Sequence, residues 1–191
     1  MLTLNEVFCR KDYPAREDTR VVVDIGSNIG ISALYFLTRN SQSRCYLYEP
    51  DPANLPKLKH NLKEYEDRYV LNPNAVSYQA GDLEFGTEAT GRYGGLGVDT
   101  GHFITVTTVT INDVLASVLA TEDYVDVLKL DIEGLEVPTV AAINEVYLPK
   151  VRSIYLEHID SKPLAPIFPR YFQQTQRGSI CRLVSKKQST F

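Results

Sequence analysis

Short apolar runs alternate with amphipathic stretches along this chain of 191 residues. The β-branched run at 20–25 predicts a strand, and residues 31–37, apolar nearly all round, predict a helix packed against a sheet. The pair recurs as a strand over 44–48 and a helix pattern over 55–65. Pro56 removes a hydrogen bond early in this second helix, which predicts a local irregularity.

Capping residues and a glycine-rich loop punctuate the pattern. Asp51 is expected to cap the second helix, and Thr110 begins a later one with Asp113 at capping-box spacing. The loop 91–101 is expected to be either a mobile lid or a plain hairpin connection. The remaining predicted elements are strands at 69–76, 83–85, 103–109, 125–130, 153–156 and 180–184 and a helix at 137–147.

Strands and helices that alternate in this way predict right-handed βαβ units and a mostly parallel sheet flanked by helices. An apolar content of 43% is enough for one continuous core, so residues 1–191 are expected to form a single domain. In such sheets the ligand binds beyond the carboxyl ends of the strands, where the strand order reverses. The residues that directly follow each strand are therefore the candidates for a site.

The composition of the chain indicates which partners and which cellular compartment to expect. The chain has 24 acidic against 20 basic residues, which argues against a nucleic-acid partner. Cys9, Cys45 and Cys181 are widely spaced and are expected to be free thiols in a reducing compartment. Neither a signal peptide nor a membrane-spanning run is visible, so a cytoplasmic protein without a membrane partner is expected. The oligomeric state stays open, a homodimer included.

The turn after the first strand reads DIGSNIG and is the candidate cofactor loop. Gly26 and Gly30 let a ligand approach the backbone closely, and the helix that follows offers its N-terminal amides, with Ser27 in the same turn. Asn28 stands where the dinucleotide pattern GxGxxG has its second glycine, and Asp24 can face a ligand ammonium. A glycine-rich turn without a ligand is the alternative.

The next two strands end in residues that suit a nucleoside. Glu49 can accept two hydrogen bonds from the vicinal hydroxyls of a ribose, although a solvated acid at a strand end is the alternative. Asn74 and Ala75 combine an amide with a small apolar group, which suits the edge and face of an adenine, or else belong to a simple turn.

The later strands end in charged residues. Period-two alternation puts Lys129 and Asp131 on one face of their strand, and a lysine in an apolar strand needs an acidic partner such as Asp131. Glu133 follows, and the next strand ends with Glu157 and His158. These residues are the candidate catalytic groups; a purely structural Lys129–Asp131 pair is the alternative. The acids have oxygen ligands for a divalent ion, but no spacing requires one.

The chain resembles a known family from about residue 7 to residue 157. The motifs VVVDIGSNIG, YEPDP, NAVS, VTTVTINDVL, VLKLDIEGLE and IYLEH follow one another in the order seen in FkbM-type S-adenosylmethionine-dependent methyltransferases. The resemblance implies a Rossmann-like class I fold with a seven-stranded sheet, and usually O-methylation of small hydroxylated compounds. That fold ends in an antiparallel hairpin, but only the strand 180–184 is legible here, so a reduced hairpin is expected.

The resemblance also implies roles for individual residues. The methionine end of S-adenosylmethionine would lie against Asp24, Gly26, Asn28 and Gly30; Glu49 would bind the ribose; Asn74 and Ala75 would border the adenine; and Asp131 and Glu133 would face the reacting centre. The expected function is therefore methyl transfer to a hydroxyl of a small molecule. Asp131 or Glu133 is the expected base, with Lys129 orienting it and Glu157 and His158 in reserve.

Two other functions remain open from the sequence. A nicotinamide oxidoreductase uses a similar sheet but normally carries GxGxxG, which this chain lacks. A non-catalytic domain that binds a nucleoside or S-adenosylmethionine would bind the cofactor without turnover.

Overall fold

The structure is a computed structural model that describes residues 4–87, 94–96, 99–158 and 163–188. In this part of the chain a central sheet of seven strands has the order β10-β11-β9-β8-β1-β2-β3. The strands are β1 (Val21–Ile25), β2 (Arg44–Tyr48), β3 (Tyr69–Asn72), β8 (Val125–Leu130), β9 (Val151–Glu157), β10 (Phe172–Arg177) and β11 (Ile180–Ser185). From β9 to β3 all neighbours are parallel, whereas β11 runs antiparallel to both of its neighbours. The predicted Rossmann-like sheet is confirmed.

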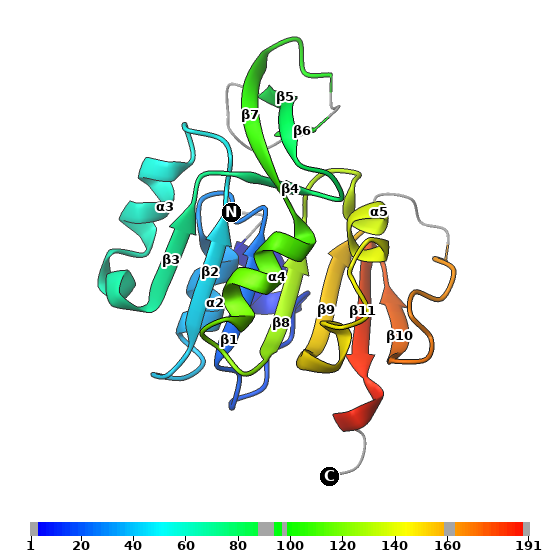
Figure 1. Ribbon diagram of the computed structural model, residues 1–191. Helices are drawn as coiled ribbons and strands as arrows, with labels where there is room; N and C mark the ends of the chain where they lie inside the picture. The colour runs from blue at the N-terminus through cyan, green and yellow to red at the C-terminus, as the bar shows by residue number, and fades with distance from the viewer. Residues whose placement is uncertain (1–3, 88–93, 97–98, 159–162, 189–191) are drawn as a thin grey trace.

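The strand order reverses between β1 and β8. From β1 the chain proceeds outward to β2 and β3, and it then returns to β8 on the other side of β1 before it continues to β9. Because β1 and β8 are parallel neighbours, their carboxyl ends lie at the same edge of the sheet (Figure 1). This edge is where α/β sheets bind their ligands.

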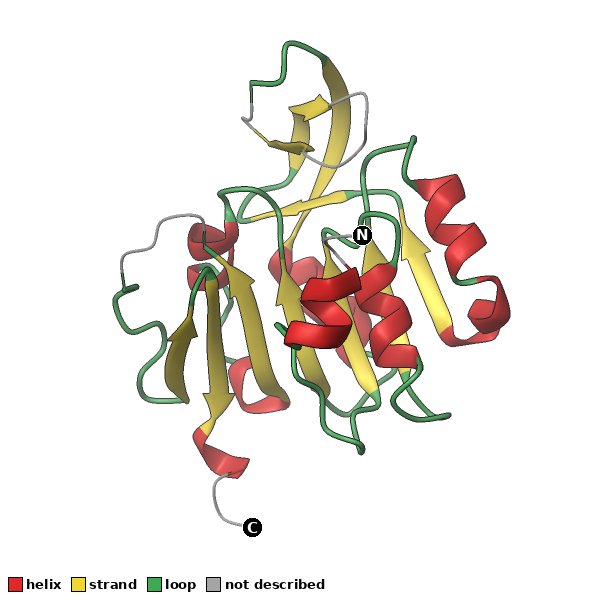
Figure 2. Cartoon of the chain, turned by 180° about the vertical axis from the view of Figure 1, so that it is seen from behind, coloured by secondary structure: helices red, strands yellow, loops and turns green. Residues whose placement is uncertain are grey.

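Helices cover both faces of the sheet (Figures 1 and 2). The helical elements are the π-helix η1 (Asn5–Arg10), the α-helices α2 (Ile31–Leu37), α3 (Leu55–Asn61), α4 (Ile111–Leu119) and α5 (Glu136–Ala141), and the 3₁₀ helices η2 (Lys63–Arg68), η3 (Leu148–Lys150) and η4 (Lys186–Gln188). Helices α4 and α5 pack on one face, and η1 and α2 pack on the other. Within the described residues, none of the helices has the length and apolar character needed to cross a bilayer.

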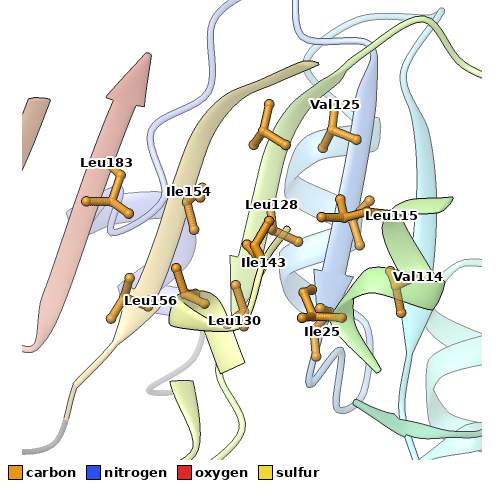
Figure 3. Packing of buried hydrophobic residues seen from close by; sticks show 14 of the residues in the cluster. Ile25, Val114, Leu115, Val125, Leu128, Leu130, Ile143, Ile154, Leu156 and Leu183 are labelled. Atoms are coloured by element: carbon orange, nitrogen blue, oxygen red, sulfur yellow. The ribbon is translucent and has the colours of Figure 1, made fainter. Parts of the chain in front are cut away.

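Alternation along the strands divides the core into two layers. Ile25 of β1 and Leu128 of β8 pack against Leu115 of α4, in the layer drawn in Figure 3. Val22, which points to the opposite face of β1, packs with Phe36 of α2. All five of these side chains are at most 1% exposed, so both faces of the sheet are closed and its functional surface is the edge.

The C-terminal hairpin is complete, and the prediction of a reduced one was wrong. Strand β10 pairs antiparallel with β11 from Phe172–Ser185 to Arg177–Ile180. Along β10 only Phe172 is buried, because this strand lies at the edge of the sheet and the rest of it is glutamine, threonine and arginine. A strand that buries so little apolar surface leaves no clear hydrophobic alternation in the sequence.

The strand predicted over 69–76 is two strands in two different sheets. Pro73 separates β3 from β4 (Ala75–Ser77), which pairs with β7 (Phe103–Thr110) in a smaller sheet of order β4-β7-β5-β6. Its other members are β5 (Gly81–Thr87) and β6 (Gly94–Leu96). The predicted β5–β7 pairing is confirmed, and the small sheet projects beyond the carboxyl ends of the central strands (Figure 1). Residues 91–93 and 97–98 of the suggested lid lie outside the described residues.

The helix predictions need three smaller corrections. Pro56 lies in the first turn of α3, where a missing amide breaks no helical bond, so the irregularity comes later, at Tyr65 in η2. The residue at the N-cap position of α3 is Asn54 rather than Asp51. Helix α5 ends at Ala141 instead of 147, whereas the capping box of Thr110 and Asp113 at α4 is confirmed.

Candidate functional site

The DIGSNIG turn leaves β1 directly beside the end of β8. Gly26 has a φ of +75°, and a Cβ placed on it would lie 1.8 Å from the carbonyl oxygen of Asp131. Glycine is therefore required here both by backbone conformation and by close approach of the two chains. The amides of Gly26 and Ser27 donate to the carbonyl of Tyr48 at 3.0 and 3.1 Å, which ties the turn to β2 as well.

A buried ion pair connects these two strands. The Lys129 Nζ lies 3.0 Å from Asp24 Oδ1 and 3.4 Å from Asp131 Oδ2, and it donates to the carbonyl of Gly26 at 3.2 Å. Burial lowers the pKa of Lys129, but the two carboxylates outweigh burial and leave this pKa raised, so the lysine stays charged. The prediction that Asp131 or a neighbouring acid pairs with Lys129 is confirmed, and Asp24 lies closer to the lysine than Asp131 does.

The carboxylate of Asp24 is engaged inside the protein. It is completely buried, and besides Lys129 it accepts a hydrogen bond of 2.5 Å from the Ser32 hydroxyl of α2. The ammonium group that Asp24 faces in this structure is thus that of Lys129. Asp24 therefore lies beneath the cofactor loop, where its carboxylate holds Lys129 between the ends of β1 and β8.

Two carboxylates lie at the mouth of the site. Asp131 follows β8 and is 31% exposed at its side chain, and Glu157 ends the neighbouring β9. Burial and the negative charge of Asp131 raise the pKa of Glu157 to about 7, although the Ser179 hydroxyl donates to it at 3.0 Å. Such a carboxyl group holds and releases a proton near neutral pH, which suits a general base.

Glu133 and His158 lie near these acids, but neither side chain lines the cavity described below. Glu133 has a left-handed φ of 56°, and burial together with the charges of Asp131 and Glu136 raises its pKa to about 7. His158 is half-buried, and its backbone amide donates to the carbonyl of Ser179. Their catalytic roles stay predictions.

Glu136, which the sequence analysis did not single out, shapes the loop after β8. Its buried carboxylate accepts from the amide of Ile132 at 2.8 Å and from that of Gly134 at 3.0 Å. These bonds hold the strained segment that contains Glu133 and follows Asp131. The sequence signal for this role is an acid in the first turn of α5, since such acids commonly accept hydrogen bonds from backbone amides at the start of a helix.

Glu49 supports the cofactor loop from behind. Only 4% exposed, its carboxylate accepts from the amide of Asn28 at 2.7 Å and from that of Asp51 at 2.9 Å. Burial raises the pKa of Glu49 in spite of these two bonds. The predicted ribose contact stays a prediction, because in this conformation backbone amides occupy both carboxylate oxygens.

Asn74 and Ala75 lie after β3, with Ala75 at the start of β4. The Asn74 side chain donates to the carbonyl of Thr107 at 3.4 Å, and Ala75 is buried with Phe85 in the core of the small sheet. Neither residue lines the cavity described below. Their contact with adenine stays a prediction.

A cavity of about 70 Å³ lies between the two strand ends. Of the site residues that the sequence predicted, those that line the cavity are Gly26, Ser27, Asn28, Lys129, Asp131 and Glu157. Gly30 lies just beyond them, at the N-cap position of α2. This volume accommodates about five water molecules. It is comparable with the amino-acid end of an adenosyl-amino acid.

The opposite wall of the cavity comes from the N-terminal segment, which the sequence analysis did not connect with the site. Its lining residues are Glu6, Val7, Arg10, Asp12 and Tyr13. The Tyr13 ring lies 5.3 Å from the Lys129 Nζ and packs edge-on against Tyr155. No local pattern reveals this wall, because the contact joins residues more than a hundred positions apart.

Among the residues that the structure describes, no group of three or more His, Cys, Asp or Glu side chains is arranged to hold a metal ion. Cys9, Cys45 and Cys181 are free thiols, as predicted, and the latter two are buried.

The sequence of the chain is similar to those of known methyltransferases. Residues 24–175 match the family described as "Methyltransferase FkbM domain". A protein named "Methyltransferase 1" from Beauveria bassiana is 22% identical over 182 residues, which cover 82% of this chain and 72% of that protein.

Solved structures share the fold. The methyltransferase FkbM of Methylobacillus flagellatus KT has a TM-score of 0.60 and 18% identity over 95% of this chain, which spans only 47% of that protein. A putative caffeoyl-CoA O-methyltransferase from Staphylococcus aureus has a TM-score of 0.52 and 11% identity, with 97% and 83% of the two chains covered. TrmK of M. capricolum, solved with S-adenosylhomocysteine, has a TM-score of 0.51 and 9% identity, with 97% and 69% covered.

The family match begins with Asp24 and includes the cofactor loop, the end of β8 and the end of β9. The match thus covers the candidate site except for its N-terminal wall. The chain belongs to the FkbM domain family of methyltransferases.

Proposed function

We propose that this chain binds S-adenosylmethionine at the ends of β1 and β8 and transfers its methyl group to a hydroxyl oxygen of a small molecule. The observation that carries the proposal is the single cavity that joins the backbone of the DIGSNIG turn to the carboxylates Asp131 and Glu157. A glycine turn suits close approach of a ligand, and acids beside it suit proton removal from an acceptor.

The donor group fits the residues present. Gly26, Ser27 and Asn28 of the DIGSNIG turn line the cavity, and glycine at position 26 lets this turn lie close against the backbone of Asp131. When bound, S-adenosylmethionine supplies a sulfonium whose methyl group is electrophilic. The M. capricolum protein of this fold was solved with the demethylated product of that cofactor.

The protein's own contribution is to orient the acceptor and to remove its proton. A neutral hydroxyl is a weak nucleophile, so Asp131 or Glu157 accepts its proton while the new C–O bond forms and the C–S bond breaks. Both carboxylates line the cavity, whereas Glu133 does not. Lys129 stays charged, with its ammonium 3.4 Å from the carboxylate of Asp131.

Small hydroxylated acceptors are favoured over nucleic acid on two grounds. The chain carries a formal net charge of −4, and the mouth of the site is acidic, which repels a phosphate backbone. Two proteins of this fold are named as putative O-methyltransferases, from Staphylococcus aureus and Klebsiella pneumoniae, although others of the fold are named as RNA methylases.

Calorimetric titration tests the cofactor, and methyl transfer tests the acceptor. The purified chain is titrated with S-adenosylhomocysteine and, in parallel, with NADH; binding of the first alone is expected. Radiolabelled S-adenosylmethionine is then supplied with a panel of sugars and phenols and, separately, with RNA. Binding of NADH without S-adenosylhomocysteine contradicts the proposal, and so does methyl transfer to RNA alone.

A further inference from the structure

The N-terminal segment 5–14 is a packed wall of the site. Val7 and Tyr13 are 2% and 5% exposed in the core layer beneath α2. The ring of Phe8 packs edge-on against Tyr35 at 5.4 Å, and the Tyr155 hydroxyl donates to the carbonyl of Pro14 at 2.6 Å. Residues between these anchors are therefore held at defined positions over the cavity.

Two cations line the cavity among the residues that the structure describes, Arg10 and Lys129. Lys129 is committed to Asp24 and Asp131 inside the protein. Arg10 lies at the surface with 55% of its side chain exposed, so its guanidinium can reach a ligand at the mouth. Arg10 is thus the cation that remains for an anionic ligand group.

Arg10 already makes the kind of contact that a carboxylate ligand would offer. Its Nε donates to Asp12 Oδ1 at 3.2 Å, and its Nη2 donates to the other oxygen of the same carboxylate. Glu6 lies 4.0 Å from Nη1 on the same side. Two parallel N–H donors in a planar fork match one carboxylate group well, which a lysine ammonium does not.

We propose that Arg10 and Asp12 form the subsite for the amino-acid end of the cofactor. Arg10 exchanges the carboxylate of Asp12 for the α-carboxylate of the ligand, and Asp12 then accepts the ligand's α-ammonium. The exchange replaces one ion pair by two and leaves no charge without a partner, as a zwitterionic ligand requires.

The subsite deepens the proposed function and rests on it. Both residues precede residue 24, where the family match begins, so the match assigns them no role. The cavity that they border, of about 70 Å³, is comparable in volume with an amino-acid end.

Two ligands distinguish binding at this subsite from binding at the rest of the cofactor site. S-adenosylhomocysteine carries the amino-acid end, whereas 5′-methylthioadenosine has the same nucleoside and thioether without it. Titration of Arg10→Ala is expected to show S-adenosylhomocysteine binding about tenfold weaker or worse, since a charge-assisted forked contact is lost. Its affinity for 5′-methylthioadenosine is expected to match that of the wild type.

The chain offers a matched control in Arg16. Arg16 makes the same forked contact with Asp18, two residues on, at 2.8 and 3.1 Å, but neither residue lines the cavity. Arg16→Ala is expected to leave both affinities unchanged, and Arg10→Lys to recover only part of the loss. Circular dichroism confirms that each variant is folded.

The outcomes distinguish the two proposals. If the wild type does not bind S-adenosylhomocysteine, the proposed function fails. If the wild type binds it and Arg10→Ala binds it equally well, the cofactor assignment stands and the subsite is overturned. An equal loss of affinity for both ligands also overturns the subsite, because the effect would then not depend on the amino-acid end.

Discussion

The ammonium of Lys129 lies 3.0 Å from the carboxylate of Asp24, and the two side chains are 2% and 0% exposed. The residues are partners in register on the adjacent parallel strands β8 and β1. A buried pair of this kind joins the two strand ends between which the ligand is proposed to bind.

Removal of the lysine alone is expected to be strongly destabilising. Lys129→Met leaves Asp24 buried without its cation, which lowers the free energy of unfolding by about 3–5 kcal/mol. Urea denaturation followed by circular dichroism measures the change. The double variant Lys129→Met with Asp24→Leu removes both charges and is expected to recover much of the loss. A single variant as stable as the wild type would contradict the importance of the pair.

Gly26→Ala is expected to damage both folding and cofactor binding. Its methyl group would lie 1.8 Å from the Asp131 carbonyl at a φ of +75°, so strain adds to a backbone collision and the loss exceeds about 2 kcal/mol. Gly178→Ala is the control, since Gly178 has a φ of +60° and no atom within 4 Å of its Cβ position. The control is expected to lower stability by only about 1 kcal/mol. Similar losses in both variants, measured by thermal denaturation, would show that the close approach is relieved easily.

The raised pKa of Glu157 has a consequence for stability. Between pH 4.5 and about 7 the folded chain binds a proton at Glu157 that the unfolded chain has released, so the free energy of unfolding falls as pH rises through this window. Glu157→Gln removes this dependence and is expected to be more stable than the wild type at pH 8 by roughly 1 kcal/mol, after allowance for solvent screening. Denaturation at pH 5 and at pH 8 measures the difference. Equal pH dependence in the two proteins would show that burial does not hold the proton on Glu157.

The rate of methyl transfer reports which carboxylate is the base. If Glu157 accepts the proton, the rate rises about tenfold between pH 6 and pH 8, because the deprotonated fraction rises through a pKa of about 7. Glu157→Gln then loses turnover while it retains S-adenosylhomocysteine binding. A rate that is flat over this range in the wild type, together with loss of turnover in Asp131→Asn, would assign the base to Asp131 instead.

Local patterns were sufficient to predict the main elements. Period-two alternation predicted that Lys129 of β8 and Asp131, directly after this strand, point to the same side, and their charged groups are 3.4 Å apart. The glycines of the DIGSNIG turn predicted a tight strand-to-helix connection, and Thr110 with Asp113 predicted the start of α4. Each of these features depends on residues that are neighbours in the chain. The sequence by itself therefore determined the parallel sheet and the place of the cofactor loop.

The tertiary structure alone decided which charged groups meet. Asp24 is the closer partner of Lys129, and the Glu49 carboxylate accepts a hydrogen bond from a backbone amide of the cofactor loop. Both contacts depend on the order and register of strands that are far apart in the sequence. The wall that Arg10 and Tyr13 add to the cavity likewise depends on how the N-terminal segment packs against α2 and β9. A sequence pattern records the periodicity of each element, whereas contacts between elements arise only when burial of their apolar faces brings them together.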